Sequence, residues 1–437
     1  MKTIFSLPDG PTLGGVTTWT AEMCRRLSSA GRPVALVEHV TFNPKLPLDL
    51  FKKIERIDCT AGQHADSLFL KEKDATFFAQ QYQQGIPATI IPNWSVGTYA
   101  ACAQIAAEQP ESLRVIGYAH TDEDLYYDWL TYYEPIIHHF VCVSVETGGK
   151  LMGKIPHRIG DISIQPYAVH APKILNRSYS TQPEPLKLIY AGRIAQRQKR
   201  VFDLILLIEQ LVSKQVNFNL RIIGNGDEYQ SLSQKLEDLG SEGKKRVTLE
   251  PGLLPDQMAE TWRSADVFLS VSEYEGTSIA MLEAMGQGCV PVVTQVSGTQ
   301  SVIVEGENGF SVEIGDAETM ATSIARLDDQ RNEITKLGCS AHQTILNRYA
   351  YDEYINWFEQ LIDNVWQLPN RPWPSNRPII PPRLSGIKRA DLNGALKGDP
   401  AARRILQHKL LHATRLATPY YFMRGIAQRI LDPSQNN

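Results

Sequence analysis

Two stretches of the chain alternate short runs of aliphatic residues with longer segments in which apolar residues recur every three to four positions. The short runs predict buried strands, and the longer segments predict amphipathic helices. In the first stretch the predicted strands lie at 3–7, 34–37, 88–91, 114–118 and 140–144. In the second they lie at 186–191, 219–224, 247–249, 267–270 and 290–294. Strands that alternate with helices are typical of a parallel sheet, so the predicted fold class is α/β.

A polar segment that contains several prolines, residues 171–185, separates the two stretches and is typical of an interdomain linker. The sequence therefore predicts two doubly wound, Rossmann-like domains, residues 1–178 and 179–368, followed by a basic, proline-containing extension at 369–437. Ligands of such sheets bind at the carboxyl ends of the strands. We therefore expect the site in the cleft between the domains.

Charge divides the chain unevenly. The 437 residues carry a formal net charge of −4, which argues against nucleic acid as the main partner. Residues 370–437 nevertheless carry a net +9, which leaves −13 for residues 1–369. The basic, periodic part of this tail, 401–431, suits packing on the acidic body, which we favour, or peripheral contact with an anionic membrane surface.

Composition places the protein in the cytoplasm. Apolar residues make up 43% of the chain, as in globular proteins, and no run approaches the roughly 18 apolar residues of a spanning helix. The six cysteines are far apart and lack zinc-binding spacing, which predicts reduced thiols.

The most specific motif begins after the predicted strand 267–270. A glycine turn at Gly276 leads into a helix that opens at Thr277 or Ser278. Free backbone N–H groups at such a helix start, aided by the helix dipole, form a site for a diphosphate. Glu275 in the turn and Glu283 about two turns along the helix could accept hydrogen bonds from sugar and ribose hydroxyls. The spacing alone is equally typical of a capped helix with two solvated glutamates.

Five blocks together carry a family resemblance. They are Gly14-Gly15-Val16, His120, residues 140–144, Tyr190-Ala191-Gly192-Arg193 with Gln198-Lys199-Arg200, and Glu275-x7-Glu283 with its Glu-Ala-Met-x-x-Gly-x-x-Pro continuation. In this order they resemble the retaining nucleotide-sugar glycosyltransferases of family 4, which have the GT-B fold. The resemblance covers most of residues 1 to 350.

The resemblance implies a role for each block. Arg193 and Lys199 would hold the donor diphosphate, with Arg200 as a substitute because the spacing is one residue longer than in many members. The Gly14–Gly15 turn would face the donor phosphate, and His120 would lie near the donor sugar. Taken singly, these features are also typical of surface charge, a tight turn and a structural histidine.

Two other sequence patterns are not interpreted as functional sites. Residues 148–155 fit a phosphate-binding loop only in part, because Ile155 stands where serine or threonine is needed and Pro156 obstructs the helix. The acidic triplet 122–124 matches a metal motif, but its place after His120 favours a helix start.

The predicted reaction is transfer of a sugar from a nucleotide diphosphate sugar to a hydroxyl of a glycan, glycolipid or small molecule, and the resemblance implies that the anomeric configuration is retained. His120, Arg193, Lys199 and Glu275 form the predicted catalytic set. Fixed cations stabilise the charge that develops on a leaving diphosphate, so no metal or other cofactor is expected. The alternatives are a nucleotide-sugar epimerase and a non-catalytic nucleotide-sugar-binding scaffold.

Overall fold

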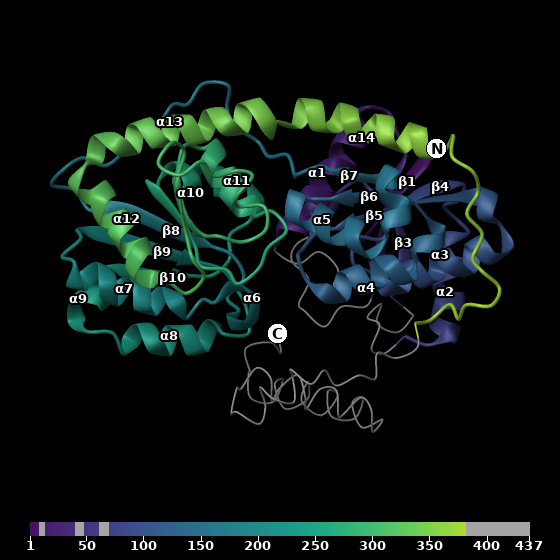
Figure 1. Ribbon diagram of the computed structural model, residues 1–437, viewed down its shortest axis with the longest axis horizontal. Coiled ribbons are helices and arrows are strands. Elements are labelled where there is room, and N and C mark those ends of the chain that lie inside the picture. Colours follow the sequence, from purple (N-terminus) through teal and green to yellow (C-terminus); the bar gives the residue numbers. More distant parts are fainter. Residues whose placement is uncertain (8–13, 40–47, 61–69, 382–437) are drawn as a thin grey trace.

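The computed structural model describes residues 1–7, 14–39, 48–60 and 70–381. These residues form two α/β domains that lie side by side (Figure 1), each built on one parallel sheet. The two predicted Rossmann-like domains are therefore confirmed. Residues 382–437, which hold most of the predicted basic extension and its predicted membrane contact, lie outside the described residues.

The N-terminal sheet has seven strands in the order β3-β2-β1-β4-β5-β6-β7. Its strands are β1 (Lys2–Leu7), β2 (Val34–His39), β3 (Glu55–Cys59), β4 (Ala88–Ile91), β5 (Leu113–Ala119), β6 (Ile137–Cys142) and β7 (Ile162–Ile164). Its helices are α1 (Gly15–Ser29), α2 (Glu72–Tyr82), α3 (Val96–Glu108), α4 (Asp124–Tyr132) and α5 (Val145–Lys154). Short 3-10 turns are η1 (Leu48–Phe51), η2 (Pro110–Ser112), η3 (Glu134–Ile136) and η4 (Pro156–Asp161). Residues 148–154 of the partial phosphate-loop pattern lie within α5 and are helical.

The C-terminal sheet has six strands in the order β10-β9-β8-β11-β12-β13. Its strands are β8 (Leu186–Ala191), β9 (Phe218–Ile223), β10 (Val247–Glu250), β11 (Val267–Ser270), β12 (Val290–Thr294) and β13 (Phe310–Val312). The helices after β8 are α6 (Gln196–Lys199), α7 (Asp203–Ser213), α8 (Tyr229–Glu237), α9 (Ser241–Lys245), α10 (Pro255–Arg263), α11 (Ile279–Gly286), α12 (Ala317–Asp329), α13 (Arg331–Arg348) and α14 (Tyr351–Val365). In both sheets the strand order reverses beside the first strand, and the carboxyl ends of the strands at such a reversal are where ligands of doubly wound sheets bind.

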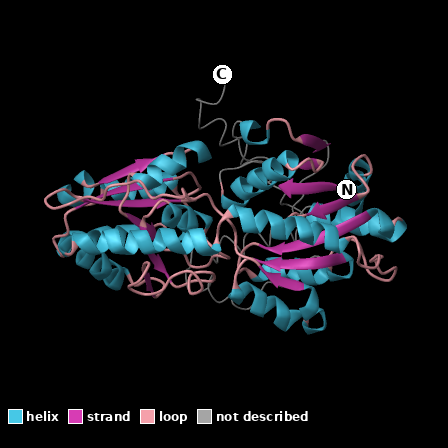
Figure 2. Cartoon of the chain, turned by 90° about the horizontal axis from the view of Figure 1, so that it is seen from above, coloured by secondary structure: helices cyan, strands magenta, loops and turns pink. Residues whose placement is uncertain are grey.

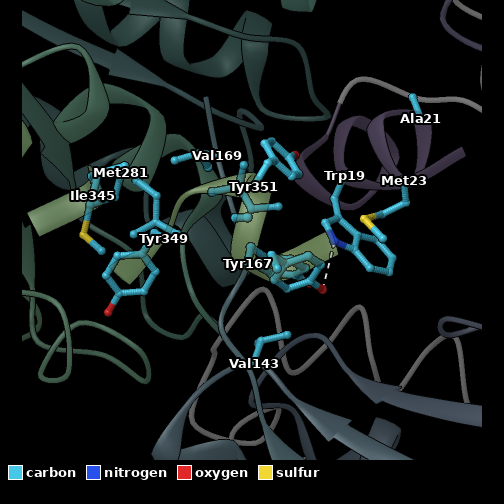
Figure 3. Close-up of a cluster of buried hydrophobic side chains, with 14 of the residues drawn as sticks. Trp19, Ala21, Met23, Val143, Tyr167, Val169, Met281, Ile345, Tyr349 and Tyr351 are labelled. Carbon is cyan, nitrogen blue, oxygen red and sulfur yellow. Dashed lines mark hydrogen bonds between the residues drawn. The ribbon is translucent and has the colours of Figure 1, made fainter. Parts of the chain in front are cut away.

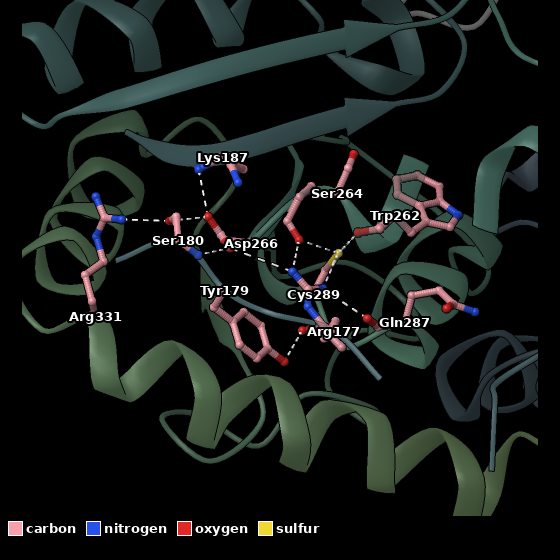
Figure 4. Close-up of polar contacts among 12 residues, drawn as sticks. Arg177, Tyr179, Ser180, Lys187, Trp262, Ser264, Asp266, Gln287, Cys289 and Arg331 are labelled. Atoms are coloured by element: carbon pink, nitrogen blue, oxygen red, sulfur yellow. Dashed lines mark hydrogen bonds and ion pairs between the residues drawn. The ribbon is translucent and has the colours of Figure 1, made fainter. Parts of the chain in front are cut away.

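The interdomain linker is anchored to the C-terminal domain by a buried polar network (Figure 4). Ser180 donates to the carboxylate of Asp266 over 2.5 Å and accepts from the guanidinium of Arg331 over 2.7 Å. Arg177 donates to the carbonyl of Gln287 over 3.0 Å. Because buried polar groups are costly unless they are paired, these bonds define where the linker becomes part of the second domain.

Helix α14 crosses back to the first domain (Figures 1 and 2). The indole of Trp19 donates to the Tyr354 hydroxyl over 3.1 Å, and Arg32 pairs with Asp363 at 2.7 Å. The sequence analysis placed this helix in the second domain, 179–368, whereas its contacts are with α1 of the first. Periodicity shows that a helix has an apolar face but not which surface that face covers. No helix in the described part of the chain is long and apolar enough to cross a membrane.

A hydrophobic cluster continues across the domain boundary (Figure 3). Trp19, Val143 and Tyr167 of the first domain belong to the same buried cluster as Met281 and Ile345 of the second. Burial of shared apolar surface holds the two sheets in one arrangement.

The described start of the extension packs on the first domain beside α4. Trp373 is 6% exposed and lies 5.6 Å from the Tyr133 ring, between centroids. Its indole donates to the carbonyl of Arg377 over 2.9 Å, and Arg377 in turn donates to the carbonyl of Tyr132 over 2.7 Å. The Tyr133 hydroxyl donates to the carbonyl of Ile379 over 2.9 Å. This segment therefore completes the first domain's surface.

We predict that Trp373→Ala lowers the free energy of unfolding by about 3 kcal/mol, because it empties a buried aromatic site. Trp373→Phe should retain most of the stability, since it keeps the apolar contact and loses one hydrogen bond. Chemical denaturation of both variants measures the difference. Equal midpoints for Trp373→Ala and the native protein would contradict the packing role.

Candidate active site

The two domains meet at backbone level where β5 ends. Thr121 pairs with Gly276 in an isolated antiparallel bridge, and the Asp122 amide donates to the carbonyl of Glu275 over 3.0 Å. A Cβ atom on Gly276 would lie 2.2 Å from the carbonyl oxygen of His120. Only glycine allows this approach. The structure thus brings His120, Glu275 and Gly276 together from opposite domains.

Glu275 is the buried acid of this junction. Its Oε1 accepts from the Ser272 hydroxyl over 2.7 Å and forms an ion pair with Lys199, the last residue of α6. Arg200, the possible substitute, instead pairs with Glu273 at 2.6 Å. Lys199 rather than Arg200 therefore enters the site, despite the longer spacing from Arg193.

Arg193 lies two residues past β8 and is exposed. Its carbonyl accepts from the Tyr190 hydroxyl over 3.0 Å, which fixes the backbone. Burial raises the pKa of Tyr274, and the Arg193 guanidinium opposes that rise, so its charge acts on the segment next to Glu275. The Arg193 guanidinium makes no hydrogen bond or ion pair with another residue of the described ranges, which leaves its charge available to an anion.

The predicted glycine turn precedes α1 and approaches the second domain. A Cβ atom on Gly15, the first residue of α1, would lie 3.0 Å from Cδ1 of Ile279, the first residue of α11. Gly14 is the N-cap of α1 and is exposed, with no atom within 4 Å of a Cβ built on it. The amino-terminal ends of α1 and α11 are therefore neighbours, and their dipoles favour an anion beside them.

Thr277 and Ser278, which precede α11, each use their hydroxyl for a different hydrogen bond. The Thr277 hydroxyl donates to the carbonyl of Val143 over 2.5 Å and so ties the turn to the first domain. The Ser278 hydroxyl caps the helix by accepting from the Met281 amide over 3.3 Å. The predicted helix start at this point is confirmed, and both side chains are already engaged.

Glu283 lies one turn beyond Ile279 on α11 and is half-buried. Burial raises the pKa of its carboxyl to about 7, with a smaller opposing effect from His170. It does not join the Lys199–Glu275 pair. The two glutamates of the motif thus occupy different environments, an ion-paired one and a desolvated one.

The imidazole of His120 is engaged on both sides within the first domain. Its Nε2 lies 2.9 Å from Oδ1 of Asn93, and its Nδ1 bonds to the hydroxyl of Tyr167. The ring is stacked between Tyr118 and Tyr167, and burial lowers its pKa to about 3, so it is neutral. In this arrangement the backbone of His120, rather than its ring, reaches the second domain.

The helix start expected at the acidic triplet is confirmed, because Glu123 is the N-cap residue of α4 and Asp124 lies in its first turn. Asp122 pairs with Lys150 at 2.7 Å and bonds to the hydroxyl of Ser297 in the second domain. Glu123 is the N-cap residue of α4 but makes no capping bond, and it pairs with Arg197 at 2.6 Å. The side chains of Asp122 and Glu123 thus bond to residues of the second domain, and Glu123 makes no capping bond to α4.

Sequence reasoning missed Asn93 and Tyr167. Asn93 lies two residues after β4, at the carboxyl edge of the sheet, and that position was its signal. Tyr167 lies in the segment after β7 and carries no local signal, because only the fold places it beside His120.

The C-terminal half of this junction is similar to a known domain class. Residues 174–344 match the family described as glycosyl transferases group 1. The match covers the segment that carries Arg193, Lys199, Glu275 and Glu283.

Sequence relatives are glycosyltransferases and a related synthase. The chain is 29% identical over 143 residues to the lipopolysaccharide core biosynthesis glycosyltransferase LpsE of Rhizobium meliloti, which is 33% of this chain and 41% of that protein. It is 24% identical over 191 residues to the N-acetyl-alpha-D-glucosaminyl L-malate synthase of Bacillus anthracis, 44% of this chain and 49% of that protein. The chain thus aligns with less than half the length of these two relatives.

Solved structures share the complete two-domain arrangement. TarM of S. aureus, a G117R mutant in complex with fondaparinux, alpha-GlcNAc-glycerol and UDP, superposes with a TM-score of 0.66 at 13% identity. That match covers 84% of this chain and 100% of TarM. The lipopolysaccharide outer core galactosyltransferase WaaB gives 0.65 at 18% identity, over 83% of this chain and 99% of that one. The expected GT-B fold is confirmed.

We predict that Gly276→Ala separates the domains, because its methyl group would overlap the His120 carbonyl and a Val143 methyl, 2.6 Å away. Small-angle scattering should show a larger radius of gyration, and the melting temperature should fall by several degrees. Gly149→Ala in α5 is the matched control, since a Cβ there meets no atom within 4 Å. Alanine has a higher helix propensity than glycine, so the control variant should be as stable as the native protein or slightly more stable. An unchanged scattering profile for Gly276→Ala would count against the junction.

Proposed function

We propose that the protein is a glycosyltransferase that moves a sugar from a nucleotide diphosphate sugar to a hydroxyl of a carbohydrate or lipid-linked acceptor. One observation carries the proposal. The amino-terminal ends of α1 and α11 are neighbours at the same interdomain junction as the Lys199–Glu275 pair. The group 1 domain match and the UDP in the TarM complex support a nucleotide diphosphate as the ligand of such a junction.

The proposed chemistry is stabilisation of the leaving group. As the glycosidic bond breaks, negative charge develops on the diphosphate, and Arg193, Lys199 and the two helix ends would offset it. These groups can supply the positive charge without a metal ion. Glu275, held by Lys199 and Ser272, would accept hydrogen bonds from hydroxyls of the donor sugar.

We propose retention of configuration at the anomeric carbon. The family resemblance supports it, and so does the carboxylate arrangement. A covalent route of the glycosidase type needs two carboxyl groups about 5–5.5 Å apart across the scissile bond. Here Glu275 is ion-paired in the turn before α11, and Glu283 lies one turn inside that helix, in a different environment. Departure and attack on one face of the sugar fit these residues better.

The function is tested with a panel of nucleotide sugars. A bound donor should raise the melting temperature, because a ligand that binds only the folded state stabilises it. The stabilising donor should then be hydrolysed slowly without acceptor, and NMR of the transfer product should show the donor's anomeric configuration. Binding without any turnover would identify a scaffold instead, and an inverted product would contradict retention.

We predict that Arg193→Ala and Lys199→Ala each lower kcat by roughly 10²–10³-fold, the scale for losing one donor to a developing negative charge. Donor hydrolysis followed by release of nucleoside diphosphate measures this. Lys214→Ala is the control, because it removes one positive charge at the exposed end of α7 in the same domain. Near-native turnover in both site variants would overturn the diphosphate assignment.

We predict a pH-dependent donor affinity through Glu283. Its carboxyl, with a pKa of about 7, is neutral below that pH and ionised above it, and a carboxylate is the stronger acceptor for ribose hydroxyls. Affinity for UDP should therefore rise roughly fivefold between pH 6 and pH 8 relative to Glu283→Gln. Titration calorimetry measures the affinity of both proteins at each pH. The ligand's own phosphate ionises with a pKa of about 6, and this affects both proteins equally, so the ratio of their affinities reports on Glu283 alone. Parallel pH curves would exclude this role.

A further inference from the structure

Asn93 occupies a constrained position at the carboxyl edge of the first sheet. Its backbone has a φ of 52°, in the left-handed region that asparagine tolerates better than most residues. The side chain is 1% exposed. Its Nδ2 donates to the carbonyl of Ser6 over 2.7 Å, and its Oδ1 lies 2.9 Å from Nε2 of His120. A strained, buried polar residue persists where its surroundings determine it.

These two bonds specify one tautomer of His120. A carbonyl oxygen only accepts, so the amide nitrogen of Asn93 must face Ser6 and its oxygen must face the imidazole. His120 Nε2 then carries the proton and donates it to Asn93 Oδ1. Its Nδ1 is left bare and accepts from the Tyr167 hydroxyl. A buried imidazole with both nitrogens satisfied in this way has one orientation.

The orientation of His120 is transmitted to the second domain through its own backbone. The carbonyl of His120 is the atom that excludes a side chain at Gly276. The next two residues make the bridge to Gly276 and the bond to the Glu275 carbonyl. Asn93, His120 and the Glu275 turn therefore form a continuous path from the β4 edge to the proposed donor site.

The same turn places an aromatic ring beside the imidazole. Trp94 follows Asn93 and meets His120 edge to face, with ring centroids 5.5 Å apart and planes at 82°. The left-handed backbone of Asn93 sets the direction of the chain at Trp94, which follows it in the loop after β4. Asn93 thus positions both the His120 imidazole, through its side chain, and the Trp94 ring, through its backbone.

We propose that Asn93 is a positioning residue for sugar transfer, which holds His120 as the neutral Nε2–H tautomer and thereby holds the end of β5 against the Glu275 turn. This inference rests on the proposed glycosyltransferase function. It assigns His120 an architectural task rather than proton transfer. Loss of the Asn93 amide should affect the geometry of the bound donor, and so kcat, more than donor binding.

The test compares Asn93→Gly with Asn93→Ala. Glycine keeps the left-handed backbone and removes the amide, whereas alanine also adds backbone strain. Asn93→Gly should lower kcat roughly 10-fold, the effect of losing about one buried hydrogen bond, with donor KM within about twofold. Asn93→Ala should show the same kcat loss and a lower melting temperature. Gln215→Gly is the matched control, because it replaces an exposed left-handed residue of the second domain, with a φ of 57°.

Nitrogen-15 NMR of the His120 ring supplies a second readout. The native protein should show a protonated Nε2 and a bare Nδ1, and Asn93→Gly should show a mixture of tautomers. A native kcat in Asn93→Gly, or a native ring with the opposite tautomer, would overturn the proposal. If the native protein turns over no nucleotide sugar, the proposed function fails and Asn93 has no role in transfer. The two failures can be told apart. An inactive native protein contradicts the proposed function, whereas an active native protein with an equally active Asn93→Gly variant contradicts only the role of Asn93.

Discussion

The arrangement of this molecule depends on the absence of one side chain at Gly276. The end of β5 in the first domain and the turn before α11 in the second approach so closely that a single methyl group would overlap the His120 carbonyl. The other contacts that join the two domains at the candidate site lie beside that approach. Asp122 bonds to the Glu275 carbonyl, Thr277 bonds to Val143, and the start of α1 lies next to the start of α11.

The charged side chains at the junction fall into two groups. Some pair across the domain boundary and hold the domains together, and others lie beside the Glu275 turn. Asp122 and Glu123 of the first domain are occupied by Ser297 and Arg197 of the second. Lys199 is paired with Glu275, and its charge is thus held next to the turn before any anion arrives. A preorganised cation needs little reorganisation when charge develops beside it, which is the condition under which such groups contribute most to catalysis.

The first domain contributes rigidity. The stack of Tyr118, His120 and Tyr167 is buried, neutral and hydrogen-bonded, and Asn93 closes it from the β4 edge. Helix α14 packs against the same region. The Tyr354 hydroxyl accepts a hydrogen bond from the Trp19 indole, which contacts the His120 ring. The second half of the chain therefore supports the first-domain side of the site as well as providing most of the charged groups.

The sequence by itself determined the α/β class, the two domains and the central strands, because buried parallel strands are continuous apolar runs. It did not predict the edge strands β3, β7 and β13, which are short or alternate with polar residues. It also singled out Glu275 and Gly276, since a strand, a glycine turn and a helix start are local patterns, and the family resemblance added Lys199. The tertiary structure decided which cation meets Glu275, why Gly276 must lack a side chain, where α14 packs, and that Asn93 and Tyr167 hold His120. Each of these depends on residues dozens to hundreds of positions apart, which only the folded chain brings into contact.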